Sequence, residues 1–275
     1  MEQIEQRPNL RKNLPTTALV TGTTSGIGKA FVELLASEGW NLILVSRDLR
    51  KLNLQQRQLE HQFNVECEVI QADLAIEEDL NRVSRRLLDD HRPVTVLVNN
   101  AGFGLNRDFG VSQLSDQVRL TRVLVIAPLE LCHSAIQSMK KSGGGYIINV
   151  SSVAAFMTGG TYCAAKSWLN TFSESLSGEL GSSGINVYAV CPGFTRTEFH
   201  MRCSQDVSGV PNFMWLKPER VAREAWGAVQ RGKRLSIPSL QYKMLVSLHR
   251  FAPRWLVHGY ATLAKRFLRR GGRNS

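Results

Sequence analysis

The sequence predicts an α/β fold with a doubly wound, seven-stranded, mainly parallel sheet and helices on both of its faces. Short apolar segments rich in β-branched residues alternate with longer amphipathic segments along most of the 275 residues. The short segments, among them ALVTG, LILVS and VLVN, are apolar on both faces. Strands of that kind are typical of a parallel sheet buried between two helix layers, and right-handed crossovers wind it in both directions.

Each element is predicted from its own pattern. β-branched or apolar runs bounded by turn residues predict strands at 16–22, 41–47, 65–74, 94–100, 146–150, 186–190 and, as a short last strand, 235–238. Apolar residues spaced by three and four predict helices at 27–37, 49–62, 77–89, along a stretch that ends at Lys141, and at 162–180. With no repeat or linker in between, we expect a flexible leader (1–14), one domain (15–239) and a basic amphipathic helical extension (240–275).

Composition excludes several classes of protein. Apolar residues make up 43% and charged residues 21% of the chain, which is typical of globular proteins. The five cysteines are scattered and form no CxxC pair, so a disulfide framework is not expected, and the histidines lack metal-ligand spacing. The leader has no apolar run of a signal peptide, and no segment reaches the ~18–20 apolar residues of a membrane span. We expect a cytoplasmic protein without a metal.

A glycine-rich turn follows the first predicted strand. Residues 21–28 read TGTTSGIG and lead directly into a predicted helix. Glycines let the backbone turn sharply and approach a pyrophosphate closely, and the helix start offers unpaired N–H groups and the positive end of its dipole. The alternative is a tight turn without a ligand. The turn predicts a dinucleotide site with contacts from Gly22, Thr24, Ser25, Gly26, Ile27 and Gly28.

A tyrosine and a lysine share one face of a later predicted helix. Tyr162 and Lys166 stand at positions i and i+4 of the segment YCAAK, so both can point into one cleft. Together with TGxxxGIG and with NNAG at 99–102, this segment resembles the short-chain dehydrogenase/reductase family from about Thr16 to Thr197, and more loosely to Pro238. The resemblance implies a Rossmann-like fold and hydride transfer between a nicotinamide and a carbonyl/alcohol pair.

The resemblance also implies catalytic roles. Tyr162 would handle the proton, because the Lys166 ammonium and a positively charged nicotinamide favour the phenolate and lower the pKa of the phenol from about 10. Ser152 corresponds to the family's catalytic serine and would hold the substrate oxygen. The ten residues from Ser152 to Tyr162 are fewer than in many members, so either the loop is trimmed or Ser151 shares the role.

Arg47 ends the second predicted strand, where NAD-preferring sites carry an acidic residue. Its planar fork suits a 2′-phosphate, so NADP(H) is the expected cofactor and NAD(H) the less favoured one; a solvated Arg opening a helix is the alternative. The resemblance implies further cofactor contacts from Asp73, Leu74, Asn100, Ala101, Gly102, Tyr162, Lys166, Pro192, Gly193, Thr195 and Thr197.

Leu124 departs from the family pattern. It stands where the family commonly has an Asn that supports a water relay to the lysine, and a leucine cannot bind that water. A non-catalytic NADP(H)-binding sensor or scaffold is therefore the alternative function. Residues 198–216, where family members place the substrate lid, are rich in apolar side chains and indicate a hydrophobic substrate: Phe199, Met201, Phe213, Met214 and Trp215. The resemblance also implies a homodimer or homotetramer built on the long helices.

The C-terminal part of the chain is strongly basic. Residues 217–275 carry 14 Lys or Arg and two acidic residues, a net charge of +12, against −1 in the rest. Between Trp255 and Leu268, apolar residues recur at helical spacing. Such a helix either packs on its own domain or a dimer mate, or makes peripheral contact with an anionic membrane surface. No recognised nucleic-acid motif accompanies the charge, so we expect no nucleic-acid partner.

Overall fold

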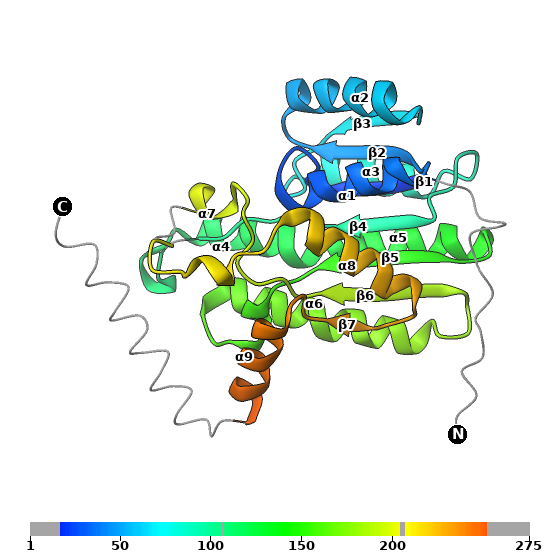
Figure 1. Ribbon diagram of the computed structural model, residues 1–275. Helices are drawn as coiled ribbons and strands as arrows, with labels where there is room; N and C mark the ends of the chain where they lie inside the picture. The colour runs from blue at the N-terminus through cyan, green and yellow to red at the C-terminus, as the bar shows by residue number, and fades with distance from the viewer. Residues whose placement is uncertain (1–16, 106, 204–206, 252–275) are drawn as a thin grey trace, which may run out of the picture.

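The computed structural model describes residues 17–105, 107–203 and 207–251. Within them lie the strands β1 (Thr17–Thr21), β2 (Asn41–Ser46), β3 (Cys67–Gln71), β4 (Val96–Asn99), β5 (Gly145–Val150), β6 (Ile185–Val190) and β7 (Leu235–Ser236). They form one parallel sheet in the order β3-β2-β1-β4-β5-β6-β7 (Figure 1). The predicted doubly wound sheet is confirmed, and its winding direction reverses between β1 and β4. Ligands of such sheets bind beyond the carboxyl ends of the strands at this switch point.

The helices of the described residues are α1 (Gly26–Ser37), α2 (Leu49–Phe63), α3 (Glu77–Leu87), α4 (Leu114–Thr121), α5 (Ala127–Lys141), α6 (Gly160–Glu179), α7 (Phe199–Arg202), α8 (Pro218–Gln230) and α9 (Leu240–Phe251). Helix α8 is absent from the sequence-based expectations, although Pro218 opens it in the position where proline fits a helix. Helix α9 falls within the expected helical extension. The leader 1–14 and the apolar pattern at 255–268 lie outside the described residues.

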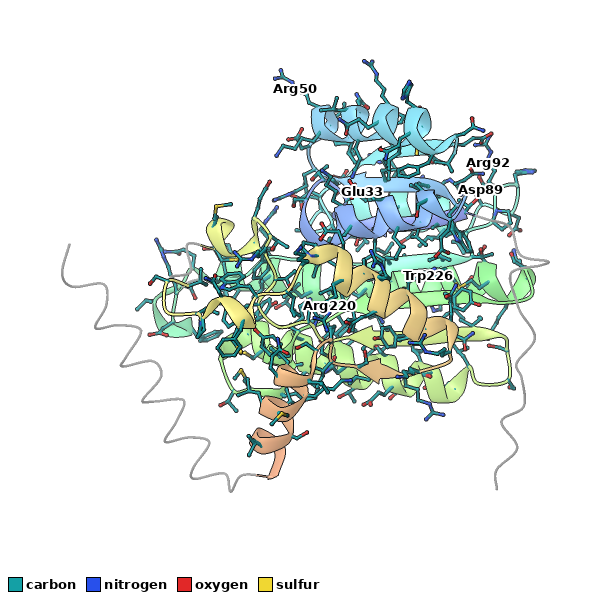
Figure 2. The ribbon with its side chains drawn as sticks, in the orientation of Figure 1. Glu33, Arg50, Asp89, Arg92, Arg220 and Trp226 are labelled. Carbon is teal, nitrogen blue, oxygen red and sulfur yellow. The ribbon has the colours of Figure 1, made fainter. Side chains whose placement is uncertain are left out.

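Two apolar layers hold the helices on the sheet. One layer joins α1, α2 and α8 to one face, and the other joins α3, α5 and α6 to the opposite face. Figure 1 shows α1 and α8 crossing in front of the sheet. In the first layer Trp226 of α8 lies edge-on to Trp40 and Tyr146, with ring centroids 5.7 and 5.4 Å apart, and its position is visible in Figure 2. Because both faces are covered, the strands read as continuous apolar runs.

The predicted long helix is interrupted. A π-helical turn, η3 (Arg122–Ile126), separates α4 from α5, and Leu124 lies buried within it. Such turns often mark functional sites, because the widened helix re-aims its backbone and side chains. Periodicity alone continues smoothly through this segment, so the sequence pattern predicted one uninterrupted helix. None of the described helices combines the length and the apolar character that crossing a bilayer requires.

Candidate active site

The glycine-rich turn lies at the switch point of the sheet. Gly22 and Gly26 have φ angles of +72° and +58°, which favour glycine. A Cβ atom on Gly28 would lie 2.3 Å from the Gly22 carbonyl oxygen, so only glycine permits this close packing of helix on turn. Ser25 precedes α1 without a side-chain capping bond. The first N–H groups of α1 are therefore available to a phosphate, and the turn fits a dinucleotide.

The segment after β4 braces this turn. The Asn100 side-chain amide donates to the carbonyl oxygens of Thr21 and Gly22 at 2.8 and 3.2 Å, and the Thr21 hydroxyl accepts from the N–H groups of Asn100 and Ala101 at 3.0 Å. Asn99 is buried and donates to the Asn149 side chain at 2.9 Å. These bonds give the NNAG segment a structural role, with Asn100 and Ala101 against the cofactor turn and Asn99 in the core.

The residues after β2 are those expected to bind the ribose end of the cofactor. The Thr24 and Ser46 hydroxyls are hydrogen-bonded at 3.1 Å. Arg47 is exposed, and Asp48 accepts from the Lys51 N–H at 3.1 Å as the N-cap of α2. Arg50 also projects from the first turn of α2 (Figure 2). The acidic side chain of this segment is thus committed to capping a helix, and the cationic ones face solvent.

Asp73 and Leu74 follow β3, and Asp73 is tied to the protein itself. Burial raises the pKa of its carboxyl, but bonds from the Arg119 guanidinium and the Ala75 N–H outweigh burial and bring the pKa below its ordinary value. Arg119 lies on α4, so this ion pair fixes the loop after β3 against the neighbouring helix. Leu74 is buried beneath the same loop. The carboxylate of Asp73 therefore has a structural task in addition to the predicted cofactor contact.

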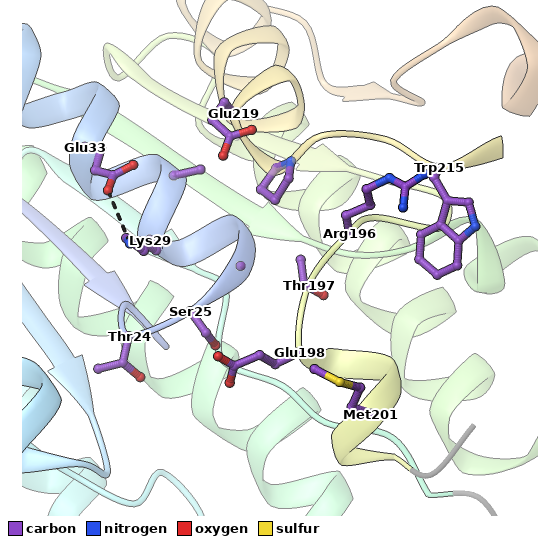
Figure 3. A pocket seen from close by; sticks show the side chains of 13 residues that line it. Thr24, Ser25, Lys29, Glu33, Arg196, Thr197, Glu198, Met201, Trp215 and Glu219 are labelled. Atoms are coloured by element: carbon purple, nitrogen blue, oxygen red, sulfur yellow. Dashed lines mark ion pairs between the residues drawn. The ribbon is translucent and has the colours of Figure 1, made fainter. Parts of the chain in front are cut away.

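A cavity of about 600 Å³ opens at the start of α1. Its lining comes from the glycine-rich turn, α1, the segment after β6 and the start of α8: Thr24, Ser25, Gly26, Lys29, Ala30, Glu33, Arg196, Thr197, Glu198, Met201, Trp215, Pro218 and Glu219. Figure 3 shows the side chains of Ser25 and Glu198 approaching each other across it. The cavity lies at the expected pyrophosphate end, and neither Ser152 nor Tyr162 lines it.

Two serines end β5, and their hydroxyls have different partners. Ser151 is buried and donates to the Lys166 carbonyl oxygen at 3.0 Å. The Ser152 hydroxyl accepts from the Ala154 N–H at 3.1 Å, at the start of the 3-10 turn η4 (Val153–Phe156), and is hydrogen-bonded to the Tyr162 phenol. The structure thus brings Ser152 to Tyr162 and turns Ser151 away into α6.

Tyr162 and Lys166 share one face of α6, as their spacing predicts. The Lys166 ammonium lies 5.9 Å from the centroid of the Tyr162 ring and donates to the Val150 carbonyl oxygen at 2.7 Å. Burial lowers the pKa of Lys166 to about 8. Burial also raises the pKa of Tyr162 well above its ordinary value, even though the bond to Ser152 lowers it. The expectation of a phenol pKa lowered by the lysine is therefore wrong for the protein alone, because desolvation of the phenolate dominates.

The π-helical turn places an apolar wall beside the lysine. A Cβ atom on Gly102 would lie 3.0 Å from Cδ2 of Leu124 and 3.9 Å from Nζ of Lys166. Gly102 thus leaves room for both side chains, and Leu124, at the position where the family pattern has an amide, lies near Gly102 together with the amine. Leu124 can offer neither a donor nor an acceptor there.

The segment after β6 lies against the glycine-rich turn. The Pro192 carbonyl oxygen accepts from Val153 N–H at 3.0 Å, and the buried Thr195 hydroxyl donates to the Gly193 carbonyl oxygen at 3.0 Å. The Thr197 methyl group would be 2.8 Å from a Cβ atom on Gly26. Of the two predicted threonines, Thr197 lines the cavity, and Thr195 is turned inward to shape the segment.

The segment 198–216, predicted to form the lid, includes α7 and contacts the tyrosine. The Phe199 ring lies 5.9 Å from the Tyr162 ring, between centroids, and the Cys203 thiol accepts from the Gly104 N–H at 3.1 Å. Farther along, Trp215 packs on Phe194 at 5.6 Å. The apolar lid predicted from the sequence therefore contacts the predicted catalytic residue through Phe199.

Sequence reasoning missed Tyr242. Its phenol accepts from the Phe194 N–H at 2.9 Å and donates to the Met214 carbonyl oxygen at 2.8 Å. It thus connects α9 with both the segment after β6 and the lid. No motif marks this tyrosine, and it stands 49 positions beyond Gly193. Its only signal in the sequence is an aromatic residue inside an amphipathic stretch.

A phosphate-binding turn at the switch point of a doubly wound sheet, next to a Ser–Tyr–Lys cluster, defines a nucleotide-dependent oxidoreductase. Residues 16–208 match the family model described as short chain dehydrogenase, and the chain belongs to this family. Members of the family act on alcohol and carbonyl groups. The family assignment agrees with the resemblance that the sequence motifs indicate.

Known proteins of similar sequence and structure include enzymes and a protein named as inactive. A short-chain dehydrogenase from Sphingobium yanoikuyae in complex with NADPH is 32% identical, with TM-score 0.78, over 85% of this chain and 93% of that one. The bulky-bulky ketone specific alcohol dehydrogenase from Comamonas testosteroni is 30% identical, with TM-score 0.74, over 96% of each chain. The human inactive hydroxysteroid dehydrogenase-like protein 1 is 29% identical over 98% of this chain and 82% of that protein.

Proposed function

We propose that this protein is an NADP(H)-dependent oxidoreductase that moves hydride between the nicotinamide and a hydrophobic carbonyl/alcohol substrate. The observation that carries the proposal is the cluster of Ser152, Tyr162 and Lys166 beside the glycine-rich turn. Bound NADP(H) supplies or accepts the hydride at nicotinamide C4. The cofactor contacts are those predicted from the sequence, with the first N–H groups of α1 facing the pyrophosphate.

The three side chains divide the work on the substrate. Ser152 donates a hydrogen bond to the substrate oxygen and holds it beside the phenol. Tyr162 gives its proton to that oxygen during reduction and takes it back during oxidation. Lys166 binds the ribose of the cofactor and, when charged, stabilises the phenolate form of Tyr162. Because burial raises the pKa of Tyr162, the phenol keeps its proton at neutral pH and is ready to act as an acid.

The preference for NADP(H) is supported by the residues after β2. Arg47 is exposed and free of a carboxylate at hydrogen-bond distance in the described residues, whereas Asp48 is occupied as the cap of α2. A guanidinium binds a phosphate in bidentate fashion, and a carboxylate would repel it. The similar dehydrogenase from Sphingobium yanoikuyae is described in complex with NADPH, in line with this preference.

A hydrophobic substrate is supported by the lid. Phe199 contacts the Tyr162 ring, so this segment brings an apolar side chain beside the predicted acid. An apolar ligand that binds there can pack against it. The similar alcohol dehydrogenase from Comamonas testosteroni is named for bulky-bulky ketones, a class that fits an apolar lid.

The central test is Tyr162→Phe, which removes the proton-carrying hydroxyl and keeps the ring. We expect turnover of an NADPH-dependent ketone reduction to fall by about 10²–10⁴-fold, with NADPH binding retained. Tyr188→Phe is the matched control, because it removes a phenol hydroxyl of β6 that is hydrogen-bonded to Ser236. Full turnover in Tyr162→Phe would refute the assignment.

The alternative is a non-catalytic NADP(H)-binding sensor or scaffold. It is favoured by the apolar Leu124 beside Lys166 and by the similarity to a human relative named as inactive. A broad panel of carbonyl compounds separates the two functions. Saturable NADPH binding without oxidation of NADPH by any compound in the panel would favour the alternative.

Three further predictions about organisation belong to this proposal. The division into a leader (1–14), a catalytic domain (15–239) and a helical extension (240–275) is one, and cytoplasmic localisation with peripheral membrane contact through the basic extension is another. Association into a homodimer or homotetramer on the long helices is supported by exposed apolar side chains just before α4, on α4 and on α5: Phe109, Val111, Leu114, Val118 and Leu129. Sedimentation of Val118→Asp alongside wild type tests the oligomer: a smaller particle is expected.

A further inference from the structure

Helix α9 presents two different faces. Tyr242 and Val246, four residues apart, are buried against the rest of the protein. Leu240, Met244 and Leu248, also four residues apart, are 73%, 66% and 69% exposed. Spacing by four puts these three side chains on one stripe of the helix, which we call the outer stripe. A stripe of large apolar side chains in water is unfavourable unless something covers it.

The charge of this part of the chain limits what can cover the outer stripe. Residues 240–275 contain eight Lys or Arg and no Asp or Glu. Lys243, which is exposed, lies on the same helix beside the stripe. An apolar stripe beside an exposed lysine, in a part of the sequence that carries only basic charges, matches a lipid surface with anionic headgroups, where apolar side chains enter the acyl boundary and cations meet the headgroups. Nucleic acid would match the charge and leave the stripe uncovered.

We propose that the outer stripe of α9 docks on an anionic membrane surface, with the basic residues of 240–275 adding electrostatic attraction. This places the docking face on described residues of α9, before the apolar pattern at 255–268. Leu240, Met244 and Leu248 enter the interface, and Lys243 stays at the level of the headgroups.

The docking helix is bonded to the lid. The Gln241 side-chain amide donates to the Phe213 carbonyl oxygen at 3.1 Å, and the Tyr242 phenol donates to the Met214 carbonyl oxygen at 2.8 Å. Phe213 is itself 70% exposed next to this bond. A membrane at α9 therefore lies beside the lid, and carbonyl compounds dissolved in lipid become the substrate class. This consequence for the substrate rests on the proposed function, whereas the docking face does not.

Vesicle sedimentation of the full chain tests the docking face. We expect binding to phosphatidylcholine vesicles that contain phosphatidylserine, weaker binding at high ionic strength, and little binding to phosphatidylcholine alone. The double variant Met244→Ser/Leu248→Ser is expected to reduce binding by about tenfold or more, because it removes two apolar side chains that enter the membrane interface. Leu54→Ser is the control, since Leu54 on α2 is 59% exposed and outside α9; it should bind like wild type.

Three results would overturn the proposal. One is no binding to either kind of vesicle, and another is unchanged binding of the double variant. The third is a wild-type protein that sediments as an oligomer while the double variant sediments as a monomer. That result would mean that a second copy of the chain covers the stripe. Tyr162→Phe should keep full vesicle binding, and the double variant should keep wild-type NADPH affinity. Turnover of Tyr162→Phe thus tests the proposed function, and vesicle binding of the double variant tests docking, so the two proposals can fail separately.

Discussion

The ring of Tyr242 occupies the space that a side chain on Gly193 would need. A Cβ atom on Gly193 would lie 2.0 Å from Cζ of Tyr242, and the phenol bonds to the Phe194 N–H and the Met214 carbonyl oxygen. One side chain of α9 therefore fixes the segment that follows β6 and the lid together. Glycine is required at position 193 by a residue that lies 49 positions farther along the chain.

Gly193→Ala is expected to lower the free energy of unfolding by about 1–3 kcal/mol, because the added methyl group overpacks the Tyr242 ring. In a Tyr242→Ala background the same change should be nearly neutral, since the ring is gone. Denaturant unfolding of the two single variants and the double variant gives the coupling between the residues. Additive effects would contradict this account of Gly193.

Ser152→Ala is expected to affect mainly turnover, and Ser151→Ala mainly stability. Ser152→Ala should lower turnover by about 10²-fold, because it removes the group that holds the substrate oxygen. Ser151→Ala should lower the unfolding free energy by about 1 kcal/mol through loss of its bond to the Lys166 carbonyl oxygen. Steady-state kinetics and unfolding curves of both variants check this. A larger loss of turnover in Ser151→Ala than in Ser152→Ala would mean that Ser151, and not Ser152, holds the substrate oxygen.

Arg47→Glu is expected to weaken NADPH binding by about 100-fold, because a guanidinium–phosphate pair becomes a like-charge contact. NADH carries no 2′-phosphate, so its affinity should stay the same or improve. Fluorescence titration with both nucleotides measures the ratio. Arg57→Glu, at an exposed position of helix α2, which follows Arg47, controls for the change in net charge. Equal losses for NADPH and NADH would contradict the assignment.

Lys166 should make stability depend on pH above neutrality. Its pKa is about 8 in the folded protein and 10.5 ordinarily, so between these values the unfolded chain binds one more proton than the folded one. Stability contributed at this site therefore rises with pH, and the burial penalty is fully present below pH 8. Relative to Lys166→Met, wild type should gain about 2 kcal/mol from pH 7 to pH 9.5. If the difference in unfolding free energy between wild type and Lys166→Met does not change with pH, the pKa of Lys166 is not lowered by folding.

Leu124→Asn restores an amide beside Lys166. We expect higher turnover, because the amide can hold a water for proton transfer, together with a loss of about 2–4 kcal/mol of stability from a buried apolar contact. Leu124→Ala is the control, since it loses the same contact and adds no amide. Turnover and thermal unfolding are measured on both. Equal effects on turnover would mean that the polar group has no part in proton transfer.

Local patterns in the sequence predict much of the fold. The strands are found close to their predicted positions, with β3 and β4 shorter at both ends than the runs 65–74 and 94–100. Apolar runs extend past the last ladder bond, so periodicity overestimates strand length. The π-helical turn at 122–126 and helix α8 are not predicted, the first because it keeps the apolar spacing of an ordinary helix.

The site, like the fold, has features that local sequence predicts and features that only tertiary packing decides. Fixed spacing along one helix or one turn is enough to bring Tyr162 near Lys166 and to shape the glycine-rich turn, because both depend on backbone geometry within a few residues. Which serine faces the phenol, how far the phenol pKa moves, and why Gly193 must lack a side chain depend on packing between segments far apart in the chain. Burial and steric contact are properties of the assembled protein, so Ser151, Tyr162 and Tyr242 take on their roles only when β5, α6 and α9 have come together.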